Sequence, residues 1–238
     1  MYDESDSVTA PTVGEAPRRG RNRTPSAQRI GAKGASTRRQ LIEATAKLVE
    51  ECGMHRLRIA DVAREAGVSQ ATFYVYFKDL EEAALAVLED LSQSTPRLLR
   101  AADRRGSKDQ AVEHARAMID LYCEYYDQHR GLFLARNLAA DSGDERFLSS
   151  RLHSVSAIQN IFAERIVEMQ GAGRIPIGMH AHSVAGVLIS LMERLGATAS
   201  LSPRMLEKGV KAESLKDAAA YVVAAVLNGC IELKDAAE

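Results

Sequence analysis

The seven residues from Gln70 to Tyr76 carry the side chains best suited to a chemical task in this 238-residue chain. They read QATFYVY and bring an amide, hydroxyl groups and short apolar groups together within about two helical turns. A short helix uses such groups to contact base edges in the major groove of DNA, and hydroxyls also bind phosphates. The segment therefore predicts a surface that reads nucleic acid.

No arrangement of residues in the chain points to catalysis. A nucleophile elbow, a phosphate-binding loop, a zinc-protease helix and a pair of facing carboxylates are all absent from the sequence. Cys52, Cys123 and Cys230 lie far apart, while His180 and His182 would lie on different sides of a helix. We therefore expect no enzyme activity, no metal site and no cofactor.

Two short helices, predicted over residues 59–66 and 70–77, would position the polar segment. Gly67 permits a sharp turn between them, and Ser69 is a good N-cap for the second helix. Three apolar residues would pack into a three-helix core, namely Val68, Phe73 and Phe77. Crossed helices can also be plain packing, so this pattern alone leaves DNA binding and a structural role open.

The stretch AGVSQATFYVYFKDLEEA, residues 66–83, closely resembles the signature of the TetR family of transcriptional regulators. Arg39–Gly53 matches the opening helix of that family, and the resemblance covers about residues 37–90. It implies a helical dimer whose recognition helices enter successive major grooves of a pseudo-palindrome, about 34–36 Å apart. Carried onto this chain, it implies DNA contacts from Arg38, Arg58, Ser69, Gln70, Ala71, Thr72, Tyr74, Tyr76 and Lys78, the two tyrosines as phosphate anchors.

Two positions depart from the family pattern. Arg58 stands where the family usually has Thr or Ser, and it cannot cap a helix because it has no acceptor, although it can bind phosphate. Leu80 stands where the family often has a Lys that touches the DNA backbone. Lys78, two residues earlier, is the candidate replacement, with a different geometry.

Charge is distributed unevenly behind the net value of -1. Residues 18–78 contain thirteen Lys or Arg against five Asp or Glu, whereas residues 1–17 are acidic. A basic segment joined to an acidic body indicates that one end meets a polyanion. The arginine-rich arm of this segment could enter the minor groove or act as a nonspecific tether; its members before the first helix are Arg18, Arg19, Arg21, Arg23, Arg29 and Lys33.

The chain divides into a disordered basic arm (1–36), a helix-turn-helix domain (37–82) and a regulatory and dimerisation domain (83–238). Ser36 or Thr37 would cap the first helix. An all-α fold is expected, with helices near 37–52, 59–66, 70–77, 80–94, 108–128, 131–140, 144–170, 180–198 and 213–228. The long helix at 144–170 would turn inward a stripe formed by Leu148, Leu152, Val155, Phe162, Ile166 and Met169.

The resemblance implies that the last two long helices pair across a two-fold axis. Their small apolar stripes comprise Val184, Val187, Leu188 and Leu191, and Ala219, Val222, Val223 and Val226. The alternative is that these stripes are buried within one subunit.

A ligand pocket would lie among the helices at 108–128, 144–170 and 180–198. The candidate ligand-binding residues are Tyr122, Tyr126, Phe133, Asn137, Phe162 and Met192, with Tyr125, Phe147 and Met169 as further wall residues. For each of these residues, the alternative that residue statistics favour is ordinary core packing. Because residues 155–163 carry few charges, we expect a mainly apolar pocket and a small apolar effector.

These features predict a sequence-specific, ligand-responsive repressor that binds a palindromic operator as a dimer. The alternatives are an activator, or an architectural DNA-binding protein without an effector. The N-terminus lacks the apolar segment of a signal peptide, and no run of about 18 apolar residues could span a membrane. The resemblance implies a bacterial cytoplasmic protein.

Overall fold

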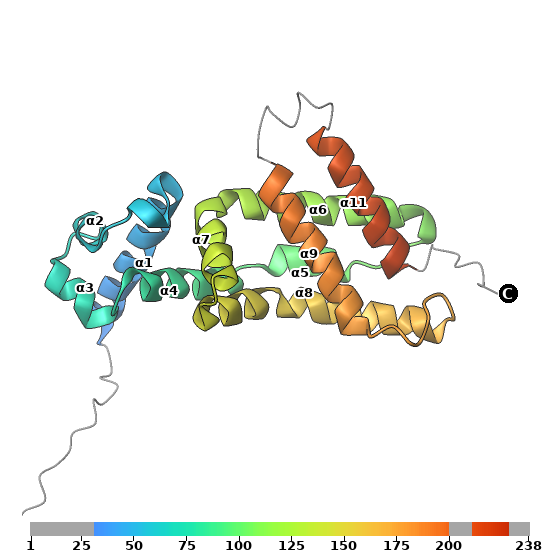
Figure 1. The fold of residues 1–238 in the computed structure, drawn as a ribbon, viewed down its shortest axis with the longest axis horizontal. Coiled ribbons are helices and arrows are strands. Elements are labelled where there is room, and N and C mark those ends of the chain that lie inside the picture. Colours follow the sequence, from blue (N-terminus) through green and yellow to red (C-terminus); the bar gives the residue numbers. More distant parts are fainter. Residues whose placement is uncertain (1–30, 200–210, 229–238) are drawn as a thin grey trace, which may run out of the picture.

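The computed structural model describes residues 31–199 and 211–228, and every regular element in these ranges is helical (Figure 1). The predicted all-α class is confirmed. In chain order the elements are α1 (Ala32–Cys52), the 3-10 turn η1 (Met54–Arg56), α2 (Ile59–Glu65), α3 (Gln70–Tyr76), α4 (Leu80–Ser92), α5 (Pro96–Asp103), the 3-10 turn η2 (Lys108–Gln110), α6 (Ala111–Gln128), α7 (Arg130–Asp141), α8 (Glu145–Gly171), α9 (Ala181–Ala199) and α11 (Ala212–Leu227).

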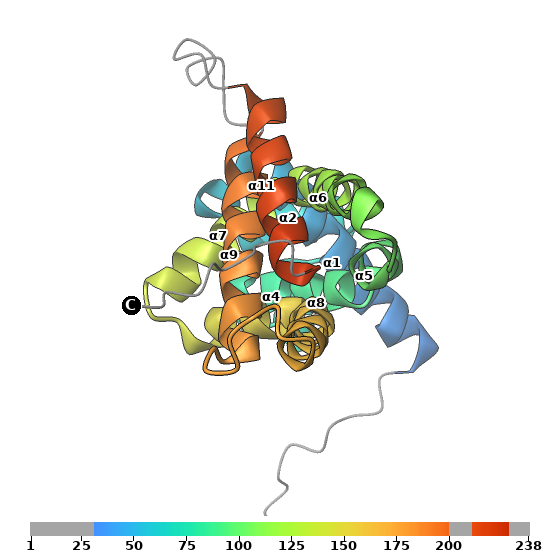
Figure 2. The same ribbon diagram turned by 90° about the vertical axis from the view of Figure 1, so that its right-hand side faces the viewer.

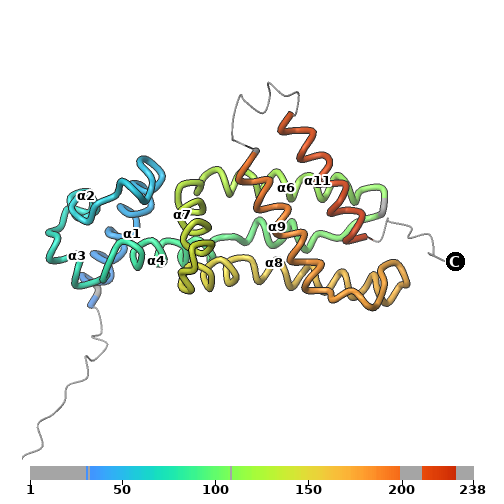
Figure 3. The backbone as a smooth tube through the Cα atoms, viewed as in Figure 1, coloured from blue at the N-terminus to red at the C-terminus, as the bar shows by residue number. Residues whose placement is uncertain are grey.

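The helices form a small N-terminal unit and a larger body. The tube in Figure 3 shows α1–α3 gathered at one end, with α4 leading from them toward the body. In the body, α9 packs on α8 and α6, and α11 packs on α6 (Figure 2). An ionic cluster also joins α6 to α11, in which Arg116 pairs with Glu213 and Asp217, and Lys216 pairs with Asp120 at 3.0 Å.

The first helix begins earlier than the sequence predicts. It begins at Ala32, so Ser36 and Thr37 lie inside it, and the Thr37 hydroxyl donates to the Lys33 carbonyl at 3.1 Å. The expected disorder is therefore wrong for residues 32–36, where Ala and Lys favour a helix. The remaining arm, with Arg18, Arg19, Arg21, Arg23 and Arg29, lies outside the described residues, as does Cys230.

Helix α5 is absent from the sequence prediction. Pro96 suggested only that the preceding helix had ended, but it occupies the first turn of α5. Its fixed φ and missing N–H suit that position, because the first N–H groups of a helix have no partner within the helix. The next helix, α6, begins at Ala111 after the turn η2 rather than at Lys108.

The buried stripe of α8 agrees with the prediction at Phe162 and Ile166 but differs from it near the start of the helix. Leu148 and Leu152 are 44% and 58% exposed, whereas Phe147, immediately before Leu148, is 2% exposed. The residues that α8 buries are Phe147, Ile158, Phe162, Ala163 and Ile166. Phe147 and Ile158 are eleven residues apart, which is close to three full turns and returns to the same face. The larger Phe147 takes the inward position that the pattern gave to Leu148.

One carboxylate links the N-terminal unit to the body. Glu50, near the end of α1, accepts hydrogen bonds from the backbone N–H groups of Gly131 (2.7 Å) and Leu132 (3.0 Å) in the first turn of α7. A negative charge at this end of a helix is stabilising because the N–H groups there carry partial positive charge. The two helices approach so closely that a Cβ added to Gly131 would lie 2.6 Å from the carbonyl oxygen of Val49.

His129, at the junction of α6 and α7, should make stability depend on pH. Its ring packs against Tyr125 and Phe133, and burial lowers the pKa of His129, an effect that the nearby Glu50 only partly opposes. The unfolded chain therefore binds a proton more readily than the folded chain, so stability present above about pH 6.5 is lost as pH falls. His129→Phe keeps an aromatic ring at this position but cannot bind a proton. We expect the melting temperature of this variant to fall less than that of wild type between about pH 7.5 and 5.5. Parallel profiles for the two proteins would contradict this assignment.

Candidate DNA-binding surface and regulatory cavity

The turn between α2 and α3 has the conformation that the sequence predicts. Gly67 has φ +68°, a left-handed conformation that glycine adopts readily. Ser69 is the N-cap of α3, and its Oγ accepts a hydrogen bond from the Thr72 backbone N–H at 3.1 Å. The Oγ of Ser69 also lies 2.9 Å from the Thr72 hydroxyl oxygen. These contacts fix the direction in which α3 leaves the turn.

The two faces of α3 differ sharply in burial. Phe73 is fully buried and Phe77, just after the helix, is 2% exposed, with ring centroids 5.7 Å apart. On the other face, Tyr74 is 58% and Val75 is 76% exposed, and Gln70 and Ala71 are also exposed. A helix anchored by two aromatic rings thus presents an amide, a phenol and short apolar groups to solvent. Those are the groups that major-groove contacts require.

The other sequence-predicted DNA contacts surround this face at different depths. Thr72 and Tyr76 are half-buried, while Arg58 and Lys78 are exposed. Arg58 is the N-cap residue of α2 and makes no side-chain capping bond, in agreement with the absence of an acceptor. Arg38, on α1, is half-buried, and its guanidinium lies 5.3 Å from the centre of the Phe77 ring. Arg38 thus supports the core beneath α3 as well as carrying charge near it.

A capping arrangement that sequence reasoning missed holds the start of α4. The Asp79 carboxylate accepts from the Glu82 backbone N–H at 2.7 Å, and the Glu82 carboxylate accepts from the Lys78 backbone N–H at 2.6 Å. An acidic N-cap followed three residues later by Glu is the signal that could have revealed it. This arrangement fixes the backbone that carries Lys78.

Removing the Ser69 cap should weaken the unit that carries α3. We expect Ser69→Ala to lower the free energy of unfolding by about 1 kcal/mol, because the N-terminal N–H of α3 loses its acceptor. Ser69→Gly should cost only a few tenths of that, since glycine is tolerated at the cap. Urea unfolding of the three proteins measures the differences, and an unchanged stability in Ser69→Ala would show that the cap contributes nothing.

The larger body contains a small cavity of about 20 Å³. Its walls come from α4, α5, α6, α7 and α8, and comprise Leu88, Ser92, Thr95, Leu98, Tyr122, Tyr125, Phe133, Arg136, Ser154, Val155 and Ile158. Among the sequence-predicted ligand residues, Tyr122 and Phe133 line it, as does Tyr125. The structure does not bring the other predicted residues to this wall, namely Tyr126, Phe147, Phe162, Met169 and Met192. Asn137 stands behind the wall, where its Oδ1 accepts from Arg136 Nε at 3.0 Å.

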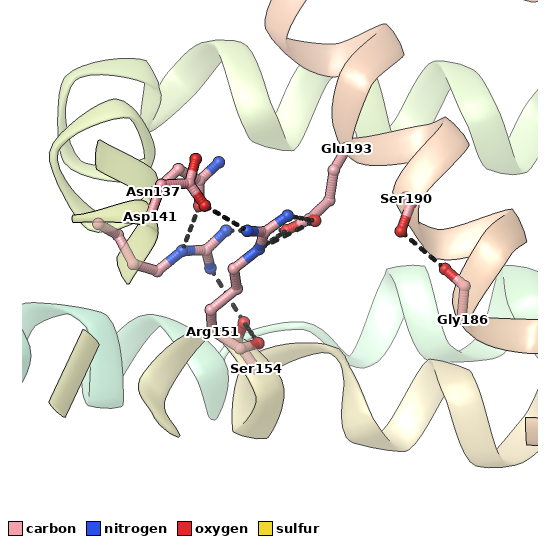
Figure 4. A network of polar contacts seen from close by, with 8 residues as sticks. Asn137, Asp141, Arg151, Ser154, Gly186, Ser190 and Glu193 are labelled. Atoms are coloured by element: carbon pink, nitrogen blue, oxygen red, sulfur yellow. Dashed lines mark hydrogen bonds and ion pairs between the residues drawn. The ribbon is translucent and has the colours of Figure 1, made fainter. Parts of the chain in front are cut away.

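The wall is more polar than the sequence analysis expected. Arg136 is 3% exposed and donates to the Glu193 carboxylate of α9 at 3.1 Å and to the Ser154 hydroxyl at 3.0 Å. Arg151 of α8 donates to the same carboxylate at 2.7 Å. Figure 4 shows Arg151, Ser154 and Glu193 turned toward one another between α8 and α9. The expectation of a mainly apolar pocket is wrong at this point, because it rested on residues 155–163 and ignored α7.

A signal for this network exists in the sequence. In α7, Arg136 follows Leu132 and Phe133 at helical spacing, so an arginine occupies the apolar stripe. In α9, Glu193 falls on the inward stripe that contains Ile189, four residues earlier. Opposite charges at inward positions of two helices predict a buried pair, since buried charges are usually paired.

Some residues of the predicted dimer stripes on α9 and α11 are buried within the subunit, and others are exposed on its surface. Leu188, Ala219 and Val223 are buried within the subunit, so these residues are not available to a partner. Val187 and Val222 are 68% and 44% exposed, and the remaining predicted members, Val184, Leu191 and Val226, are half-buried. The neighbouring Tyr221, which the prediction left out, is 66% exposed.

Within the ranges 31–199 and 211–228, no cluster of three or more His, Cys, Asp or Glu side chains could hold a metal ion. No helix in those ranges has both the length and the apolar character needed to cross a membrane.

A short helix that presents polar groups to solvent, on a three-helix core joined to a larger helical body, defines a helix-turn-helix regulatory protein. Two family models match the chain, one described as "Bacterial regulatory proteins, tetR family" over residues 41–87 and one as "Tetracyclin repressor-like, C-terminal domain" over residues 99–231. The second match alone spans more than half of the chain. The protein belongs to the TetR family of transcriptional regulators, as its sequence motif predicts.

Solved structures share this fold at low sequence identity. The regulator FadR from Bacillus subtilis, in complex with stearoyl-CoA, is 17% identical with a TM-score of 0.58, over 79% of this chain and 98% of that one. GusR from Salmonella enterica is 15% identical with a TM-score of 0.58, over 81% and 95%. A TetR/AcrR family regulator from Thermobifida fusca is 17% identical with a TM-score of 0.56, over 79% and 96%.

Proposed function

We propose that the protein is a cytoplasmic, ligand-responsive repressor that binds a pseudo-palindromic operator as a homodimer. The observation that carries this proposal is the solvent-facing side of α3, where Gln70, Tyr74 and Val75 are exposed over a fully buried Phe73. The basic segment around this helix supplies attraction to phosphates, and the exposed side chains supply contacts to bases. One short recognition helix binds weakly, which favours two copies acting together.

The homodimer would form through the outer faces of α9 and α11. These helices lie side by side at the surface (Figure 2). Their exposed or half-buried outward positions are mostly small: Ser183, Gly186, Val187 and Ser190 on α9, and Ser214, Ala218, Tyr221 and Val222 on α11. Small residues let helices from two subunits approach closely, and a two-fold axis would pair each face with its own copy.

A path for coupling runs through α7. This helix carries Phe133 and Arg136 of the cavity wall, and its first turn is held by Glu50 of α1. A ligand that displaces α7 would therefore move α1 and, with it, the unit that holds α3. Two copies of α3 fit successive grooves only at one separation, so a small displacement would weaken operator binding. The effector would be a molecule that binds more tightly when α7 is displaced and therefore favours the displaced arrangement.

Footprinting on genomic fragments enriched by the protein tests the proposal. We expect protected half-sites one helical turn apart, related by a two-fold axis, and a reporter gene behind such a site that is expressed more strongly without the protein. Val187→Glu combined with Tyr221→Glu should give a monomer by sedimentation that binds the site at least tenfold more weakly. A dimer that survives both substitutions would place the interface elsewhere. Bulk DNA binding without a preferred site would favour an architectural role.

A further inference from the structure

Two buried hydrogen-bond donors line the cavity without full sets of partners. Tyr122 is 6% exposed, and among the residues that the structure describes its hydroxyl has no hydrogen-bond partner. Arg136 has five N–H donors but makes three bonds, to Asn137 Oδ1, Ser154 Oγ and Glu193 Oε1. Among the described residues, the fully buried side-chain atom without a hydrogen bond is Arg116 Nε, so the Tyr122 hydroxyl keeps some accessible surface. Tyr122 and Arg136 both line the cavity, and a polar occupant there could accept hydrogen bonds from them.

The charge balance at this wall favours an anion. The Glu193 carboxylate, 7% exposed, is shared by the guanidinium groups of Arg136 and Arg151. Arg151 also pairs with the Asp141 carboxylate, at 3.4 Å. The Asp141 side chain is 72% exposed, so water screens its charge. The two guanidinium groups thus share one buried carboxylate, while the second carboxylate of this formally balanced network lies in solvent. Solvent screens Asp141 more than it screens the buried Arg136, so the interior side of the network is the more positive side.

Apart from Ser92 and Thr95, the rest of the cavity wall is mainly apolar. Leu88, Leu98, Phe133, Val155 and Ile158 form the remaining wall together with Tyr125. A molecule that satisfies both parts of the wall has an acidic oxygen head and an apolar body. Burial raises the pKa of the Tyr122 phenol, and the nearby Glu193 adds to the effect, so this hydroxyl keeps its proton and acts as a donor.

We propose that the effector is a carboxylic acid whose carboxylate accepts hydrogen bonds from Tyr122 and Arg136 while its apolar body packs against Leu88, Leu98 and Ile158. This inference rests on the proposed ligand-responsive function and identifies the chemical class of the ligand. The head group joins the existing ionic network on α7 and α8, where it accepts from the N–H donors of Arg136 that its three hydrogen bonds within the protein leave open.

The cavity must widen to admit such a molecule, because about 20 Å³ holds roughly one water. A more open depression of about 150 Å³ adjoins it and shares Thr95, Leu98 and Tyr125. Tyr125 separates the two spaces and is held by a long hydrogen bond, 3.4 Å, from its hydroxyl to the Leu91 carbonyl. The Tyr125 ring also packs against His129 and Phe133, so a route for the acid through the shared wall requires this ring to leave both contacts as well as the weak hydrogen bond.

The test uses the full chain and a panel of aliphatic and aromatic carboxylic acids, each matched with the primary alcohol and primary amine of the same carbon skeleton. Thermal shifts and calorimetry should show that acids bind and that their alcohols and amines bind at least tenfold more weakly. Tyr122→Phe removes one hydroxyl without changing the core volume, and it should weaken acid binding about tenfold or more. It should change binding of the matched alcohol less. Tyr221→Phe removes a hydroxyl from a residue that is 66% exposed on α11 and does not line the cavity, and it should leave acid binding unchanged.

Several results would overturn the inference: no binding by any acid, alcohols or amines that bind as well as acids, or equal acid binding by Tyr122→Phe and wild type. The same samples, assayed on operator DNA, separate this inference from the proposed function. Acids that bind without releasing DNA would support the site and contradict ligand-responsive repression. Release of DNA by a non-acidic compound would support the function and contradict the acid.

Discussion

Replacing Glu193 with alanine should lower the free energy of unfolding by about 3–5 kcal/mol, the largest effect that we expect from a single substitution. Glu193 is 6% exposed and is the carboxylate shared by Arg136 and Arg151. Without it, the buried guanidinium of Arg136 keeps only its neutral partners, Asn137 and Ser154. Burial lowers the pKa of Arg136 and Glu193 opposes that effect, so the loss of Glu193 leaves the buried charge less stable. An unpaired buried charge is far more costly than the pair itself. Urea unfolding measures the difference.

Two further variants separate the buried charge from other causes. Arg136→Met combined with Glu193→Leu removes both charges, and it should recover most of the lost stability because apolar residues of similar size replace a buried pair at little cost. Glu43→Ala breaks the exposed pair with Arg39 on α1 and should change stability little. A double variant as unstable as Glu193→Ala would show that shape, rather than unpaired charge, sets the effect.

Gly131→Ala should separate α1 from α7 and lower the free energy of unfolding by about 1–3 kcal/mol. The added Cβ would lie 2.6 Å from the carbonyl oxygen of Val49, and neither backbone can yield without moving its helix. The displacement would also stretch the hydrogen bonds that Glu50 accepts from α7. If α7 transmits the state of the cavity, the same substitution should change operator affinity in the absence of any ligand.

Gly171→Ala is the matched control, because nothing lies within 4 Å of a Cβ built there. It sits at the end of α8, where alanine favours the helix, so it should be neutral or slightly stabilising. Unfolding midpoints and DNA affinity measured on both variants give the comparison. A Gly131→Ala protein that matches wild type in both would show that the close approach of α1 and α7 has no energetic consequence.

Local patterns made the DNA-binding end predictable from sequence. The turn at Gly67, the cap at Ser69 and the buried rings of Phe73 and Phe77 are properties of adjacent residues, and the structure confirms each of them. The match to the family model over residues 41–87 has the same origin. The DNA contacts themselves stay a prediction, supported by the exposed face of α3.

The regulatory body was less predictable because its features depend on which helix faces which. Phe147 displaced Leu148 from the inward face of α8, although both residues fit the pattern. The Arg136–Glu193 pair joins residues 57 positions apart, and although each lies on an apolar stripe, the sequence does not say that these two helices face each other. Helix α5 begins with a proline whose role depends on whether the chain continues in a helix. Tertiary contacts decided all three.

The exposed face of α3 is proposed to read DNA sequence, and a comparison of wild type with Tyr74→Ala tests this. Both are titrated at near-physiological salt onto a genomic fragment enriched by the wild type and onto a scrambled version of it. Tyr74 is 58% exposed, so its loss should leave the fold intact, and Gln93→Ala, at the exposed end of α4, serves as the control. We expect selective binding by wild type and by the control, and at least a tenfold loss in Tyr74→Ala. Equal binding of wild type to both DNAs, or of wild type and Tyr74→Ala to the enriched fragment, would contradict the claim.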